Sequence, residues 1–168
     1  KQSHNYLEAT EVGQISCAIG SMMCLAFTAF QLDLPYSVHT SWAKNQIKFK
    51  SGSRRRPDYV CFDTSQNIAF AEAKGRSGSS GWSKIKSELA SKSQMSAIPA
   101  NPNGKKAIQV GCATYISPNS GFKFYAADPE PDFNLFDIDP IELINVYYES
   151  LRPIAFNEGD DDSRATPK

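Results

Sequence analysis

Apolar residues in the first part of the chain recur at helical spacing. Residues 11–31 place their larger apolar side chains on one stripe, which favours a helix that packs in the core. The members of this stripe are Ile15, Ile19, Met22, Met23, Ala26, Phe27 and Phe30. Pro35 follows and ends the helix. Apolar and polar residues then alternate over residues 46–50, which predicts a short strand.

Two apolar runs in the middle of the chain predict a β-hairpin. Residues 58–63 and 68–74 have strand character, and residues 64–67 between them are typical of a turn. If the turn is four residues long, Asp58 lies opposite Ala73. A turn one residue different places Asp58 opposite Glu72, so both registers bring it beside Glu72 and Lys74.

The second half of the chain continues the alternation of helices and strands. Helical spacing runs from Trp82 to about Ser96, and residues 106–116 and 122–127 predict two strands. A last helix starts near Pro140, capped by Asp139, with Glu142 three residues after the cap. Its expected apolar face consists of Ile141, Ile144, Tyr148 and Leu151. The 168 residues therefore predict one α/β domain over residues 1–156 and a disordered acidic tail over residues 157–168.

Residues 12–32 carry no charge and are long enough to cross a bilayer. Polar and small residues interrupt this stretch, and its apolar residues form a stripe rather than covering the whole helix surface. A core helix is therefore the preferred interpretation, and no membrane partner is expected. No basic segment precedes a small-residue cleavage site, so no secretory signal is visible.

Charge is unevenly distributed, although the net charge is zero. Residues 44–92 contain eleven lysines and arginines against four aspartates and glutamates, while residues 93–168 contain six against eleven. A basic middle between acidic flanks suits an anionic ligand bound at one place on the surface. Solvated charged faces are the simpler alternative.

The four cysteines show no spacing typical of a zinc site or a disulfide framework. Buried thiols in a reducing compartment are expected, which favours a cytoplasmic location. The chain begins with Lys1 rather than Met, so a domain released from a larger toxin also remains open.

Chemistry is expected at the end of the hairpin. Strand alternation places Glu72 and Lys74 on one face, and Ala69, Ala71 and Ala73 on the other, where a helix can pack closely. Two neighbouring carboxylates repel each other unless a proton or a cation lies between them. Mg²⁺ binds one or two carboxylates together with phosphate oxygens, and it can activate a water molecule. An ion-pair cluster at the edge of the sheet is the structural alternative.

The residues Arg56-Pro57-Asp58 and, after thirteen residues, Glu72-Ala73-Lys74-Gly75 resemble the signature of the PD-(D/E)XK, or restriction-endonuclease-like, nucleases. The resemblance covers about residues 45–116. It implies a mixed β-sheet flanked by helices in the order αβββαβ. It also implies a Mg²⁺- or Mn²⁺-dependent nuclease that hydrolyses phosphodiester bonds, most directly in DNA.

The resemblance also assigns roles to individual residues. Asp58 and Glu72 would bind the metal, together with the backbone carbonyl of Ala73, and Lys74 would be the catalytic lysine. An acid on the first helix would contribute as well, with Glu11 preferred over Glu8. Some relatives carry a Gln or Lys on the helix after the motif, a part that Gln94 or Lys92 would play.

Basic side chains on both sides of the motif are candidates for phosphate contacts, which position a nucleic acid without reading its sequence. These residues are Arg54, Arg55, Arg56, Arg76, Lys84 and Lys86. A module that keeps the fold and binds nucleic acid without cutting it is the alternative function. Monomer and homodimer, DNA and RNA, and a defence, repair or toxin context all remain open.

Overall fold

The computed structural model describes residues 8–49, 56–77, 82–90, 105–117, 121–127, 135–136 and 140–156. Along the chain the elements are α1 (Ala9–Gln31), β1 (Tyr36–His39), β2 (Tyr59–Phe62), β3 (Ile68–Ser77), α2 (Trp82–Ala90), β4 (Lys105–Ser117), β5 (Gly121–Ala127), β6 (Leu135–Phe136) and α3 (Pro140–Phe156). The first six elements follow the predicted order αβββαβ. The acidic tail expected over residues 157–168 lies outside the described residues.

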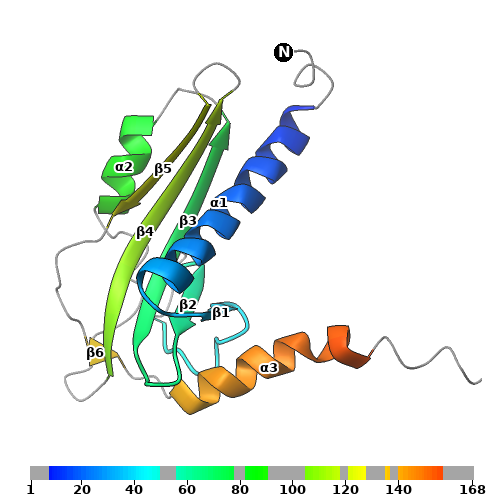
Figure 1. The fold of residues 1–168 in the computed structure, drawn as a ribbon, viewed down its shortest axis with the longest axis vertical. Coiled ribbons are helices and arrows are strands. Elements are labelled where there is room, and N and C mark those ends of the chain that lie inside the picture. The colour runs from blue at the N-terminus through cyan, green and yellow to red at the C-terminus, as the bar shows by residue number, and fades with distance from the viewer. Residues whose placement is uncertain are drawn as a thin grey trace, which may run out of the picture.

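The strands form a mixed sheet in the order β1-β2-β3-β4-β5, and the short β6 pairs with the start of β4. Neighbouring strands are antiparallel except β3 and β4, which are parallel and are connected through α2. Figure 1 shows α1 lying along β3 and β4, while α2 and α3 lie at opposite ends of the molecule. The predicted α/β class, with a mixed sheet flanked by helices, is therefore confirmed.

The strand predicted over residues 46–50 is wrong for the residues that the structure describes there. The amides of Gln46 and Ile47 both donate to the carbonyl of Ala43, at 3.0 and 2.9 Å, which makes a turn. Ile47 is buried, so its apolar character serves packing rather than strand pairing. The first strand is instead β1, which was not predicted from the sequence.

Small residues of α1 face the sheet. Its buried positions are Ser16, Gly20, Cys24 and Thr28, spaced four residues apart. Of the predicted apolar stripe, Phe27 packs against the core, but Ile15, Met22 and Phe30 are 46%, 67% and 79% exposed, so the prediction that the stripe faces the core is wrong for these three residues. The physical reason is the close approach of the helix to β3.

That close approach depends on two glycines. A Cβ atom at Gly20 would lie 2.5 Å from the Gly75 nitrogen, and one at Gly75 would overlap the carbonyl oxygen of Ser16. The small face of β3, with Ala69, Ala71 and Ala73, is therefore covered by a helix, as predicted. Among the described helices, α1 is also the one long and apolar enough by length and composition to cross a membrane.

Apolar clusters cover both faces of the sheet. Under α1, Cys24, Cys61 and Cys112 pack with small residues of β3, and burial raises the pKa of Cys61 to about 12, so this thiol stays protonated. On the other face, α2 packs through Ile85 and Leu89, as its spacing predicts.

The helix α3 covers β1, β2 and the start of β3 on the same face as α2, through Leu143, Ile144, Val146 and Tyr147. This differs from the predicted face of the last helix. Ile141, Tyr148 and Leu151 are 62%, 59% and 38% exposed, and only Ile144 of the predicted face packs on the core.

Candidate metal site

The hairpin adopts the second of the two expected registers. Tyr59 pairs with Ala71 and Phe62 with Ile68, so continuation of the ladder places Asp58 opposite Glu72. Residues 63–67 connect the paired residues Phe62 and Ile68, so the connection is one residue longer than a four-residue turn. It is closed by Asn67, whose backbone and side-chain nitrogens donate to the two carboxylate oxygens of Asp63, at 2.8 and 2.6 Å.

Asp58 is held at its backbone and at its side chain. Its carbonyl accepts the amide of Thr40 at 2.9 Å, and the Thr40 hydroxyl donates to the carbonyl of Pro57 at 2.6 Å. On the other side, its Oδ2 accepts the amide of Ala73 at 2.9 Å. These bonds tie the end of β1, the start of β2 and the middle of β3 together around Asp58.

Glu72 lies on the face of β3 opposite α1 and is 5% exposed. Its parallel neighbour in β4 is Gly111, against which Leu89 of α2 packs so closely that a Cβ at Gly111 would lie 2.9 Å from a Leu89 methyl group. Leu89 therefore forms an apolar wall beside Glu72, whose side chain is 7% exposed. Its Oε1 accepts Lys74 Nζ at 2.5 Å, whereas its Oε2 is buried and has no hydrogen-bond partner.

The environment of Glu72 disfavours its charge. Burial raises the pKa of this carboxyl group from 4.5 to about 7, the nearby charge of Asp58 adds to the rise, and the Lys74 ammonium opposes it. Near neutral pH, Glu72 is therefore divided between its protonated and ionised forms. A cation that binds to the buried oxygen would replace that proton.

These residues fit a hard divalent cation. Asp58 and Glu72 supply carboxylate oxygens from facing positions, and the unpartnered Oε2 of Glu72 is an acceptor without a donor. Such buried acceptors are costly unless a partner binds them. Within the described part of the chain, no three or more His, Cys, Asp or Glu side chains gather into a metal-binding group. Two carboxylates with a carbonyl and waters still suffice for Mg²⁺, which retains much of its hydration.

Glu11 does not join this pair in the structure. It lies in the exposed first turn of α1, and its Oε2 accepts the amide of Glu8 at 2.8 Å, so it caps the helix. The helix packs on the opposite face of the sheet from Glu72. The role expected for Glu11 as an acid of the site is therefore not supported by this arrangement, and Glu8 lies at the same exposed helix end.

Four of the basic residues predicted to contact phosphates are described, on β3, on α2 and just before β2. Arg76 is exposed two residues after Lys74, on the same strand face, and Lys84 and Lys86 are exposed on α2, which covers that face. The ammonium of Lys86 lies 4.9 Å from the centre of the Tyr125 ring. The Arg56 guanidinium lies 4.6 Å from the centre of the Phe49 ring. Arg54, Arg55, Lys92 and Gln94 lie outside the described residues.

Sequence reasoning missed three contributors to the site. Thr40 fixes the backbone around Asp58, and Leu89 with Gly111 supplies the apolar wall beside Glu72. Each acts across a long sequence separation, so no local pattern reveals its role.

The chain matches no protein-family model, no curated protein sequence and no solved structure. Inferences about its function therefore depend on the hairpin residues and their geometry.

Proposed function

We propose that this protein is a metal-dependent nuclease of the PD-(D/E)XK type, with a restriction-endonuclease-like core and DNA as its substrate. The observation that carries the proposal is the buried Glu72 carboxylate, with one oxygen unpartnered and Asp58 opposite it. Buried ionisable groups in such surroundings are concentrated at functional sites. The order αβββαβ and the small face of β3 under α1 also agree with that core.

Asp58, Glu72 and the carbonyl of Ala73 would hold Mg²⁺ or Mn²⁺. The ion, when bound, would supply Lewis acidity and lower the pKa of a water molecule. Ala73 links the two acids, because its amide donates to Asp58 while its neighbour in sequence is Glu72.

Lys74 provides the positive charge that phosphodiester hydrolysis needs beside the metal. Its ammonium contacts Glu72 and 19% of its side chain is exposed, so it lies between the buried acid and solvent. From there it orients the attacking water and stabilises negative charge on the phosphoryl oxygens as the bond to the leaving oxygen breaks. Arg76, Lys84 and Lys86 would contact flanking phosphates.

The test is a cleavage assay on closed circular DNA, linear DNA and RNA, with Mg²⁺, with Mn²⁺ and with a chelator. Glu72→Gln, Asp58→Asn and Lys74→Met are each expected to reduce the rate by roughly 100-fold or more. Asp63→Asn is the matched control, since this carboxylate lies in the same hairpin but at its turn. Wild-type, metal-dependent cutting by a folded Glu72→Gln protein would refute the proposal. Retention of DNA without cutting when Mg²⁺ is supplied would instead support the binding module.

A further inference from the structure

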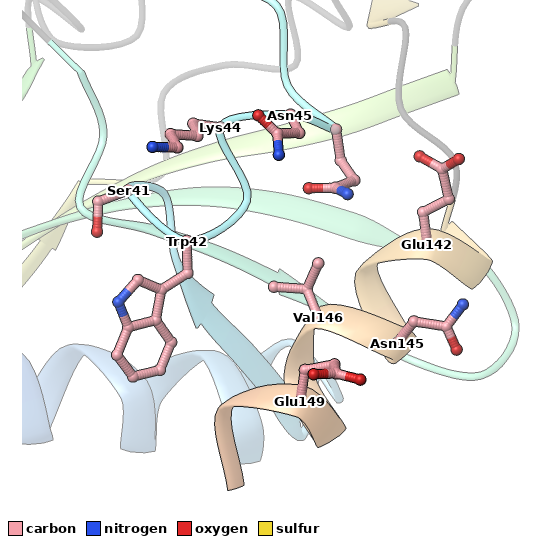
Figure 2. Close-up of a pocket in the computed structure, with 9 residues that line it drawn as sticks. Ser41, Trp42, Lys44, Asn45, Glu142, Asn145, Val146 and Glu149 are labelled. Carbon is pink, nitrogen blue, oxygen red and sulfur yellow. The ribbon is translucent and has the colours of Figure 1, made fainter. Parts of the chain in front are cut away.

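A cavity lies between the turn after β1 and the helix α3. Its volume is about 800 Å³, which is within the usual range for ligand pockets. Figure 2 shows Trp42, Lys44 and Asn45 on the turn side and Glu142, Asn145, Val146 and Glu149 on the α3 side.

Two features of this cavity point to a ligand. Trp42 is 59% exposed, so a large flat indole face is left open. Gln46, which also lines the cavity, has a side-chain oxygen that is buried and accepts no hydrogen bond. A buried acceptor without a donor costs free energy, and a small rotation of the Gln46 amide toward the cavity would let a ligand N–H group recover it.

The lining defines the chemistry of that ligand. The indole of Trp42 suits stacking by a planar ring, and the carboxylates of Glu142 and Glu149 and the Gln46 oxygen all accept hydrogen bonds. A phosphate group inside the cavity would be repelled by the two carboxylates. A neutral, flat group with amino donors fits, and Lys44 on the turn supplies a cation for an attached phosphate.

The cavity is connected to Asp58 through the backbone. Thr40 lies opposite Asp58 and donates its amide to the Asp58 carbonyl, and Trp42 follows two residues later. The Cα atoms of Trp42 and Asp58 are therefore within about 13 Å of each other, from the spacing of consecutive and paired residues. This distance is short enough for a nucleic-acid strand at the metal site to reach Trp42 within a few nucleotides.

We propose that this cavity binds an unpaired, amino-bearing nucleobase of the substrate, stacked on Trp42 and hydrogen-bonded to the acceptors of α3 and Gln46. The inference rests on the proposed nuclease function and narrows its substrate to single-stranded or locally unpaired nucleic acid. A base inside a duplex uses its amino edge for pairing and must leave the stack before a protein can hold it this way.

Tryptophan fluorescence tests the proposal without any cleavage. The chain has two tryptophans, so Trp82→Phe leaves Trp42 as the only one. In this background, with a chelator present, oligo-dC is expected to quench the fluorescence. Oligo-dT, whose base has no amino group, is expected to bind several-fold more weakly. In the otherwise unchanged chain, Trp42→Ala is expected to weaken oligo-dC binding about tenfold or more, and Trp42→Tyr to retain most of it, because base–aromatic stacking accounts for such differences.

Each failure can be told apart from failure of the nuclease proposal. Unchanged oligo-dC affinity in Trp42→Ala, or equal affinity for oligo-dC and oligo-dT, overturns the base pocket whether or not the protein cleaves DNA. Quenching by an arginine-rich peptide but not by oligo-dC also overturns it, since carboxylates beside an indole suit a cation too. Metal-free quenching that depends on Trp42 supports the pocket even if no cleavage is found.

Discussion

Replacing Glu72 with Gln is expected to stabilise the metal-free protein at alkaline pH while it removes activity. Burial raises the pKa of Glu72 to about 7 in the folded protein, against an ordinary value of 4.5. Between these two values the folded state binds more protons than the unfolded state, so the free energy of unfolding falls as the pH rises. Gln resembles the protonated acid in size and hydrogen bonding but does not ionise, so the free energy of unfolding of the variant does not fall in this way.

The expected magnitude follows from the two pKa values. Ionising Glu72 in the folded protein costs about 3 kcal/mol relative to the unfolded chain. This loss is absent at pH 4.5 and below, and it is complete once the pH exceeds about 7. Glu72→Gln should therefore match the wild type near pH 4.5 and exceed it by about 3 kcal/mol at pH 8, or roughly 6 to 12 °C in melting temperature.

The assay is urea or thermal denaturation from pH 4.5 to 8.5 in the presence of a chelator. Glu149→Gln is the control, because it makes the same chemical change at an exposed position on α3. Adding Mg²⁺ or Mn²⁺ at pH 8 should stabilise the wild type and not Glu72→Gln, since only the ionised acid binds the metal. If the free energies of unfolding of the variant and the wild type differed by the same amount at pH 4.5 and at pH 8.5, Glu72 would not be a buried, destabilised charge.

Two further predictions concern the packing of α1 on β3 and the protonation of Glu72. Gly20→Ala should destabilise the protein by about 1 to 3 kcal/mol, because its Cβ would meet the Gly75 backbone. Gly13→Ala is the control: a Cβ there would have nothing within 4 Å, so this change should stabilise α1 by about 1 kcal/mol. If both substitutions changed the free energy of unfolding in urea by the same amount, the close approach of α1 to β3 would be refuted. At limiting Mg²⁺, the cleavage rate should rise with pH through about 7 and then level off, because Glu72 must lose its proton to bind the ion. More Mg²⁺ should move this midpoint to lower pH, and a midpoint independent of Mg²⁺ would contradict Glu72 as a ligand.

The strands at the centre of the sheet were predictable because their patterns are local. Residues 58–63 and 68–74 are apolar runs separated by turn residues, and they form β2 and most of β3. The sequence allows two registers for this hairpin, because the register depends on the conformation of the turn. Gln66 adopts a positive φ of 70°, which the sequence does not specify for a residue of this type. Both registers nevertheless placed Asp58 beside Glu72.

The orientation of α1 was not predictable from hydrophobicity. A helix normally buries its largest apolar residues, but here the partner strand presents alanines and a glycine. Close backbone contact with such a surface requires small residues on the helix, so Gly20 and Cys24 are buried while Met22 and Phe30 are exposed. The face of α1 that is buried is therefore set by the match in residue size between α1 and β3. Neither segment of the sequence reveals this match when it is considered alone.

The two faces of β3 depend on each other, and this relation explains how a buried charge can persist at the site. On one face, Gly75 contacts the backbone of α1 so closely that the strand cannot shift toward or away from the helix without overlap or an empty gap. Lys74 precedes Gly75 directly, and Glu72 lies two residues further back on the opposite face. The rigid contact on one side therefore fixes the acid and the amine on the other, against the apolar wall of α2. A carboxylate on a mobile loop would turn to solvent and return to its ordinary pKa. Held on this strand beside Asp58, Glu72 instead keeps an unsatisfied oxygen that a proton or a divalent cation must fill.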